Sequence, residues 1–336
     1  SSTEGLGGFI EFKLNNFDIT NWPTFQGGGQ QFSTRFNIGQ VRTDYSLSFT
    51  DPQFLGYPLS FGFDVFDEQV DARGGTRFDQ QTQGLQLRFA KALSPYNTAR
   101  TSLRYNDFSV SGFGNFFLSK DLRELRDPGT TIANAWGFNR NTVDSYRDPS
   151  SGSTHDIMME AAGLGGDNDF VKLTHDSSWY WKLDENKKWI LSLRTREGAA
   201  WTYGDKELVP LNDRFYAGGM STIRGFDTRD VGPEVRSGIF SFGDKQRIGG
   251  ELMWVGNVEL KYITTSIMRL YGFADAGTVW KTVDDFDFGD IKYSVGLGVG
   301  FNVPRLGPVR IDYGFPLNAD EDQGSGRLHF STGFRF

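Results

Sequence analysis

The sequence of 336 residues lacks two features that would each point to a particular class of protein: cysteine and long hydrophobic runs. Without cysteine, neither a disulfide framework nor thiolate chemistry is possible. No segment approaches the ~18–20 uninterrupted apolar residues that a membrane-spanning helix needs. A helical membrane protein is therefore excluded. A membrane β-barrel is still allowed, because its strands alternate between apolar and polar residues and average out as polar.

Histidine and clustered positive charge are also scarce. Only three histidines occur, and they lie far apart: His155, His175 and His329. This spacing argues against a metal site or a catalytic triad. The net charge is −7 with dispersed basic residues, so the sequence carries no nucleic-acid footprint. The glycines between Gly296 and Gly300 lie inside a strand-like segment with no helix after it, unlike a phosphate-binding loop. We therefore expect no enzyme activity, no metal, no cofactor and no nucleic-acid partner.

Aromatic residues and glycine are abundant, with 31 Phe, 12 Tyr, 8 Trp and 42 Gly. Apolar and polar residues alternate with a period of two, which is the pattern of strands with one apolar face. In the last such segment, for example, Leu328, Phe330 and Phe334 alternate with polar residues and glycine. The pattern predicts fifteen strands, at residues 9–14, 32–38, 45–49, 59–65, 85–89, 101–105, 130–141, 155–162, 170–181, 189–196, 252–262, 268–277, 292–301, 309–315 and 327–336.

Alternation alone would also fit a soluble β protein, and two further features favour a membrane barrel. Short and long connections alternate: 94–97, 264–266 and 304–307 are short, and 113–129, 208–249 and 281–290 are long. This asymmetry is typical of outer-membrane barrels. The chain also ends on Phe336, and a soluble protein rarely leaves such an apolar strand at an exposed edge. We therefore predict an all-β fold, a transmembrane antiparallel β-barrel.

The odd number of strands suggests that one is missing, because single-chain bacterial barrels have even numbers. We interpret Ser1 as the edge of a fragment and expect sixteen strands in the family, with the first strand before Ser1. That strand should pair with residues 9–14 and close the barrel against residues 328–336. Residues 1–336 would then form one barrel domain.

The connection 208–249 is the longest in the chain, and a loop of this length is usually functional or disordered. Its centre is Ile223-Arg224-Gly225-Phe226. If the loop enters the lumen, Arg224 needs carboxylate partners, because an unpaired buried charge is very costly. Strand parity places Glu259 and Asp275 on the lumen face of adjacent strands, with Phe273 nearby for guanidinium stacking. The alternative is an extracellular loop tip in which Arg224 is solvated and has no partner.

The same stretch resembles a known signature. Tyr216-Ala217-Gly218-Gly219 followed by residues 223–226 is similar to the sixth extracellular loop of the BamA family of outer-membrane assembly factors. The resemblance continues in Phe273-Ala274-Asp275-Ala276-Gly277 and in Asp312-Tyr313-Gly314-Phe315. It implies a sixteen-stranded barrel with this loop folded into the lumen, in which Arg224 pairs with Glu259 and Asp275 and contacts Phe273. The periplasmic POTRA repeats that precede the barrel in this family are not in the chain.

The resemblance also implies a function. A BamA-like protein is the central subunit of a machinery that folds and inserts β-barrel proteins into the bacterial outer membrane through a lateral seam. The implied partners are unfolded outer-membrane proteins, outer-membrane lipids and accessory lipoproteins. The seam lies beside the terminal strand, which here carries Leu328, Phe330, Gly333, Phe334 and Phe336. The alternative is a related translocator or pore, such as a two-partner secretion or protein import channel; a passive porin is a weaker third possibility.

Overall fold

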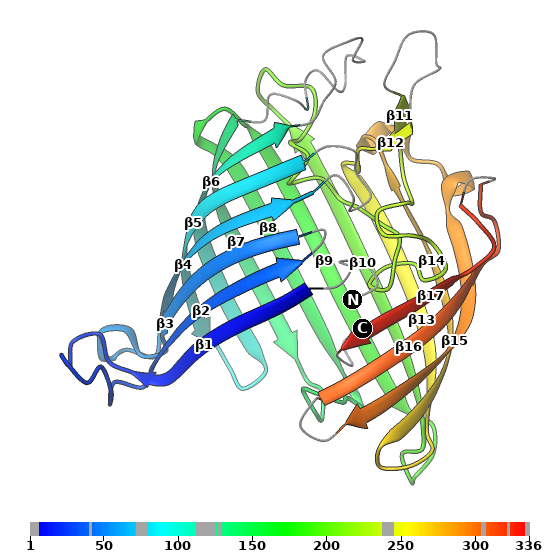
Figure 1. Cartoon of the computed structure of the whole chain (residues 1–336), viewed down its shortest axis with the longest axis horizontal. Coiled ribbons are helices and arrows are strands. Elements are labelled where there is room, and N and C mark those ends of the chain that lie inside the picture. The colour runs from blue at the N-terminus through cyan, green and yellow to red at the C-terminus, as the bar shows by residue number, and fades with distance from the viewer. Residues whose placement is uncertain are drawn as a thin grey trace.

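The computed structural model describes residues 7–39, 42–71, 79–111, 125, 129–236, 245–303, 307–320 and 323–332. Fifteen strands form one antiparallel sheet that curls around an interior space (Figure 1). They are β1 (Gly7–Phe17), β2 (Gln30–Gly39), β3 (Arg42–Asp51), β4 (Ser60–Val70), β5 (Asp79–Ala92), β6 (Asn97–Ser111), β7 (Gly129–Asn141), β8 (Gly152–Gly166), β9 (Phe170–Lys182), β10 (Trp189–Thr202), β13 (Leu252–Ile263), β14 (Met268–Trp280), β15 (Lys292–Val303), β16 (Gly307–Pro316) and β17 (Arg327–Thr332).

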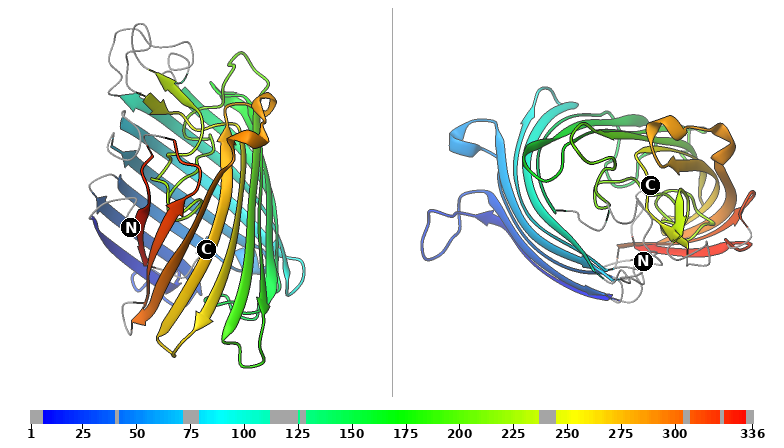
Figure 2. Two further views of the ribbon diagram at one scale, coloured as in Figure 1. Left: turned by 90° about the vertical axis from the view of Figure 1, so that its right-hand side faces the viewer. Right: turned by 90° about the horizontal axis from the view of Figure 1, so that it is seen from above.

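Each strand pairs with its neighbours along the chain, except that β10 pairs with β13 across the long connection. Within that connection β11 (Glu234–Arg236) and β12 (Lys245–Arg247) form a separate hairpin, which the sequence pattern did not predict. Seen from above, the sheet surrounds this connection, and β1 and β17 lie at its two edges (Figure 2). The predicted all-β antiparallel barrel with a loop folded into its lumen is therefore confirmed.

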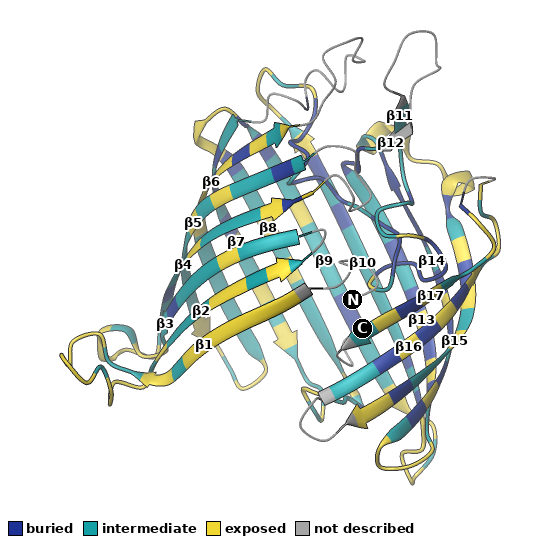
Figure 3. Ribbon diagram, in the orientation of Figure 1, coloured by how far each residue is buried: buried dark blue, intermediate teal, exposed yellow. Residues whose placement is uncertain are grey.

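Alternating burial shows how the sequence builds this wall. On β13 the side chains of Val255, Asn257 and Glu259 are buried toward the lumen, whereas Val258 and Leu260 are exposed on the outer face. Successive side chains of a strand point to opposite faces, so period-two patterning gives the barrel a polar interior and an apolar exterior. The alternation also appears along β14 and β16, whereas the edge strand β1 is exposed along most of its length (Figure 3).

The described part of the chain contains no helix long and apolar enough to cross a membrane.

Of the two edge strands, β17 is the one expected to border the seam. Among the described residues, β1 and β17 have no hydrogen-bonded pairing with each other. Of the predicted seam residues, Leu328 and Phe330 lie on β17 and are exposed, 64% and 41%. Gly333, Phe334 and Phe336 lie outside the described residues. A further strand before Ser1, and the extent of the domain, stay predictions.

The expected asymmetry between short and long connections is incomplete. The connections 18–29 and 142–151 are long, yet they belong to the same end of the barrel as the short turn 93–96. For 142–151 the structure gives a physical reason, because this turn reaches the inner wall. The Asp148 carboxylate lies 2.6 Å from Lys261 Nζ on β13 and 2.7 Å from Arg269 Nη2 on β14. The turn thus reaches across the lumen at the end opposite the long connection.

We expect Asp148→Asn to lower the free energy of unfolding by about 1–2 kcal/mol at neutral pH, because both ion pairs lose their anion. Burial opposes ionisation of Asp148, but the charges of Lys261 and then Arg269 outweigh it and lower its pKa. A depressed native pKa stabilises the fold above the ordinary pKa of the carboxyl, and this contribution disappears as the pH falls through the native value. Urea unfolding at pH 7 and at acid pH checks this: the difference from the original chain should vanish in acid. A difference that persists in acid would contradict it.

Candidate functional site

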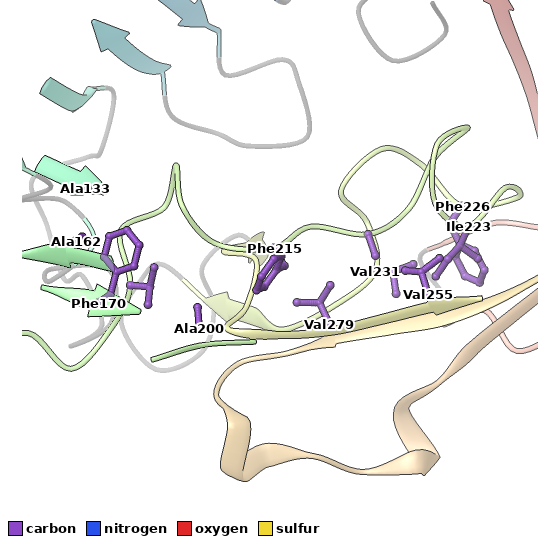
Figure 4. Close-up of a cluster of buried hydrophobic side chains, with 12 residues drawn as sticks. Ala133, Ala162, Phe170, Ala200, Phe215, Ile223, Phe226, Val231, Val255 and Val279 are labelled. Atoms are coloured by element: carbon purple, nitrogen blue, oxygen red, sulfur yellow. The ribbon is translucent and has the colours of Figure 1, made fainter. Parts of the chain in front are cut away.

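The long connection packs onto the inner wall through an apolar cluster. Phe215, Ile223 and Phe226 from the loop lie against Val255 and Val279 of β13 and β14 (Figure 4). Ile223 and Phe226 have no exposed surface. Burying side chains of this size gives ~1.5–3 kcal/mol each relative to leaving them in water. The two apolar residues of the Ile-Arg-Gly-Phe tip therefore dock the loop, on either side of Arg224.

Arg224 is held by carboxylates on three strands. Its Nε and Nη2 donate to the two oxygens of Asp275, at 2.8 and 2.7 Å, and its backbone N–H also donates to Asp275, at 3.0 Å. Its Nη1 donates to Glu259 at 2.9 Å and to Asp312 at 3.3 Å. Bidentate guanidinium–carboxylate pairs of this kind fix the geometry of both groups. The arginine side chain is 4% exposed, so that water contributes little to its solvation.

Phe273 stacks on this guanidinium. The centre of its ring lies 3.5 Å from Arg224 Cζ, within the range of a cation–π contact. Burial disfavours the charged arginine, but Asp275 first and then Glu259 and Asp312 more than compensate, so the pKa of Arg224 is raised above its ordinary value. The structure thus brings together every residue of the predicted latch: Ile223, Arg224, Gly225, Phe226, Glu259, Phe273 and Asp275. The alternative, a solvated loop tip in which Arg224 has no partner, is therefore wrong.

Several members of this network were not predicted. Arg310 on β16 donates to Glu259 at 2.5 Å and to Asp312 at 2.9 Å, and it stacks on Tyr271, 3.9 Å from the ring centre. Asn257 donates from one nitrogen to Asp275 at 2.9 Å and to the carbonyl of Thr222 in the loop at 2.7 Å. The side chains of Arg224, Arg310, Glu259, Asp275 and Asp312 therefore form one buried network of two cations and three anions. Strand parity, which places Arg310 and Asp312 on the polar face of β16, was the signal that could have found them.

Two glycines allow the loop tip to approach the wall. Gly225 has a φ of +95°, and a Cβ there would lie 3.1 Å from the carbonyl carbon of Gly314 on β16. A Cβ on Gly314 would lie only 2.5 Å from the backbone nitrogen of Gly225. Such backbone-to-backbone proximity is open only to glycine. Gly225 and Gly314 must therefore both be glycine for the loop tip to lie this close to β16.

The loop tip also contacts the terminal strand. The backbone N–H of Gly225 donates to His329 Nε2 on β17 at 3.0 Å, so this ring nitrogen is an acceptor. At the edge of the same contact, Arg327 donates to Asp227 at 2.6 Å. The latch thus connects the wall strands β13, β14 and β16 with β17, the strand that borders the predicted seam.

A second group of charges holds the start of the loop. Arg104 on β6 pairs with Glu160 on β8 and with Asp213 of the loop, the latter at 2.8 Å. Lys172 on β9 donates to the backbone carbonyl of Asp213 at 2.7 Å. Arg214, whose side chain has no exposed surface, pairs with Glu251 at 3.1 Å. The loop is therefore anchored to both halves of the wall, at its start through Asp213 and at its tip through Arg224.

Comparison with known proteins assigns the family. Residues 24–336 match the model of the Omp85 superfamily domain. The chain belongs to the Omp85 superfamily. It is 31% identical over 315 residues to the outer membrane protein assembly factor BamA of Nitratidesulfovibrio vulgaris, an alignment that covers 91% of this chain and 38% of that protein.

Solved structures agree on the fold of this Omp85 chain. BamA from Haemophilus ducreyi lacking POTRA domains 1-3 is similar with a TM-score of 0.84 at 21% identity, over 97% of this chain and 67% of that one. CdiB from Acinetobacter baumannii is similar with a TM-score of 0.63 at 15% identity, over 96% of this chain and 55% of that one. The predicted BamA-like family and the bacterial outer-membrane localisation are confirmed. Since the chain spans only 38% of the length of the relative from N. vulgaris, activity and partners are matters of proposal.

Proposed function

We propose that this Omp85 chain is the barrel part of the central subunit of an outer-membrane assembly machinery, which folds β-barrel proteins and inserts them through the seam beside β17. It acts without catalytic chemistry, and it needs no cofactor. Its partners are unfolded outer-membrane proteins, the lipids of the membrane, and accessory lipoproteins. The relative from N. vulgaris, named as an assembly factor, supports this proposal.

The observation that carries the proposal is the contact between the latch and the seam strand. β17 is an edge strand, and an edge offers unpaired N–H and C=O groups to which an incoming strand can add. The loop tip binds this strand through His329 and Arg327, while Arg224 holds the tip to the nearby strands β13, β14 and β16. The position of the loop is therefore coupled to the strand on which a client would form its first pairing.

The contents of the lumen favour insertion at the seam over transport through the pore. The loop lies inside the curved sheet (Figure 2), and the turn 142–151 reaches β13 and β14 through Asp148. A cavity of about 330 Å³ lies next to this turn, lined by Asp148, Arg194, Glu259 and Arg310 among others. A translocator would have to displace both segments before a polypeptide could pass through the lumen.

The test is assisted folding of a client. An eight-stranded outer-membrane barrel, unfolded in urea, is diluted into liposomes that contain the chain or into empty liposomes, and its folding is followed by the heat-dependent shift on a gel. We expect faster folding with the chain and a smaller acceleration with Arg224→Ala, while Lys187→Gln, which breaks an exposed ion pair with Asp144 away from the latch, keeps the full acceleration. Equal rates with and without the chain would refute the proposal. A large steady conductance without acceleration would favour the translocator.

A further inference from the structure

A row of polar side chains crosses the outer face of β8, β9 and β10, where the barrel contacts lipid. It consists of Ser153, His155, Ser177, His175 and Glu197, in that order. His155 hydrogen-bonds to Ser153 at 3.1 Å and to Ser177 at 2.9 Å. Ser177 is 2.6 Å from His175 Nε2, and His175 Nδ1 is 2.8 Å from Glu197 Oε2. These residues do not belong to the latch, which lies on the lumen side of the same wall.

Strand parity and the aromatic residues place this row within the membrane. Trp189 and Trp201 lie on the outer face of β10, twelve residues apart, and both are exposed. At ~3.3 Å per residue and a tilt of ~40°, this spacing corresponds to roughly 30 Å of height, close to the distance between the two aromatic girdles of an outer-membrane barrel. Glu197 lies between them, about 10 Å below Trp201 by the same arithmetic. Ionisable groups at membrane depth are costly and mark functional sites more often than not.

A groove adjoins the row on the same outer face. It has a volume of about 620 Å³, within the ~300–1,000 Å³ range of ligand sites, and it is lined mainly by apolar side chains: Leu173, Leu252, Trp254, Trp280, Phe286 and Ile291. Its extracellular end is formed by the connection 281–291, where Phe286 packs on Trp280. Among the described residues of its lining, His175 and Glu197 are the only ionisable ones.

The chemistry of this surface defines what would occupy it. The lining of the groove is mainly apolar, and the groove lies on the outer face of the barrel, where the hydrocarbon chains of lipids surround it. Glu197 Oε2 accepts from His175, and its Oε1 has no hydrogen-bond partner among the described residues. A free carboxyl oxygen next to an apolar groove is complementary to a neutral hydrogen-bond donor on the hydrocarbon chain. The carboxylate would repel a phosphate group.

We propose that this groove binds an acyl chain of an outer-leaflet lipid and that a hydroxyl group on the chain donates a hydrogen bond to Glu197. The row of His175, Ser177 and His155 orients the carboxyl and satisfies its second oxygen. The site lies on the outer face of the wall and the latch on its lumen face, so lipid binding and the latch are separate properties of the barrel.

The test uses the protein purified in detergent. Native mass spectrometry counts the lipid molecules that remain bound to it. The probes are phosphatidylethanolamines of equal chain length that carry an unmodified, a 3-hydroxylated or a mid-chain hydroxylated acyl chain. We expect the protein to bind a hydroxylated probe about tenfold more tightly than the unmodified probe, because the hydroxyl adds one hydrogen bond to a charged or strongly polar acceptor. Glu197→Leu should remove this preference. Ala199→Phe, which fills the groove, should weaken the retention of all three probes.

Leu193→Phe is the matched control, because it adds an aromatic ring to the outer face of the same strand away from the groove. It should leave retention unchanged. The heat-dependent gel shift verifies that each variant is folded. Equal retention of hydroxylated and unmodified probes by the original chain, or a preference that survives Glu197→Leu, would overturn the proposal. The proposal would also be overturned if two copies of the protein formed a dimer that covered the groove and no lipid bound there.

Discussion

Replacement of Arg224 by alanine is expected to lower the free energy of unfolding by about 3–5 kcal/mol, the usual cost of removing one partner from a buried ion pair. The substitution leaves Glu259, Asp275 and Asp312 buried, with 2%, 2% and no exposed surface, and removes the cation that contacts all three. Arg310 reaches Glu259 and Asp312, but Asp275 loses both of its guanidinium hydrogen bonds. The loop tip is then expected to leave the wall.

Unfolding in urea and the rate of trypsin cleavage within 208–236 measure the two effects. Arg224→Lys should fall between the original chain and the alanine variant, because an ammonium cannot make the bidentate pair with Asp275. The matched control is Arg327→Ala, whose ion pair with Asp227 is 42% and 56% exposed and should contribute at most about 1 kcal/mol. Similar stability losses for Arg224→Ala and Arg327→Ala would argue against a buried latch.

The second large effect is expected from Gly314→Ala on β16. The added Cβ would lie 2.5 Å from the backbone nitrogen of Gly225 and 2.8 Å from the carbonyl carbon of Arg224, closer than real Cβ contacts occur. Since both neighbours are backbone atoms that are fixed by the latch, the contact cannot be relieved by turning a side chain. We expect a loss of about 2–3 kcal/mol, typical of overpacking, together with displacement of the tip.

The control for this variant is Gly272→Ala on β14, where the nearest atom to an added Cβ is Leu297 Cδ2 at 3.9 Å. Both variants add one methyl group to a strand of the barrel, and they differ in whether the loop lies against it. Urea unfolding and trypsin cleavage should show a defect for Gly314→Ala and little change for Gly272→Ala. A Gly314→Ala chain with normal stability and a protected loop would contradict the close approach.

Sequence reasoning could reach the latch because the side-chain period of a strand is fixed. Glu259 and Asp275 have the parity of the lumen face on neighbouring strands, so a loop arginine that entered the lumen would meet them. The same rule also applied to Arg310 and Asp312. Their contact with Arg224 depends on the path of a forty-residue loop, which periodicity does not determine.

Other features could not be predicted from the alternation of apolar and polar residues, for different reasons. The short hairpin of β11 and β12 has too few residues for a periodic signal. The contact of Asp148 with Lys261 and Arg269 joins residues more than a hundred positions apart. His175 and Glu197 form a pair because β9 and β10 align them in register, and alternation within one strand carries no information about register.

The central claim is that Arg224 holds the loop tip inside the barrel beside the terminal strand, and one cross-linking measurement tests it most directly. The chain has no cysteine, so Asp227→Cys with Arg327→Cys introduces the only two thiols, on the tip and on β17. A short bifunctional thiol reagent should link them nearly completely in the folded protein, and adding Arg224→Ala should abolish most of the product. Equal cross-linking with and without Arg224, or none in either protein, would contradict the claim.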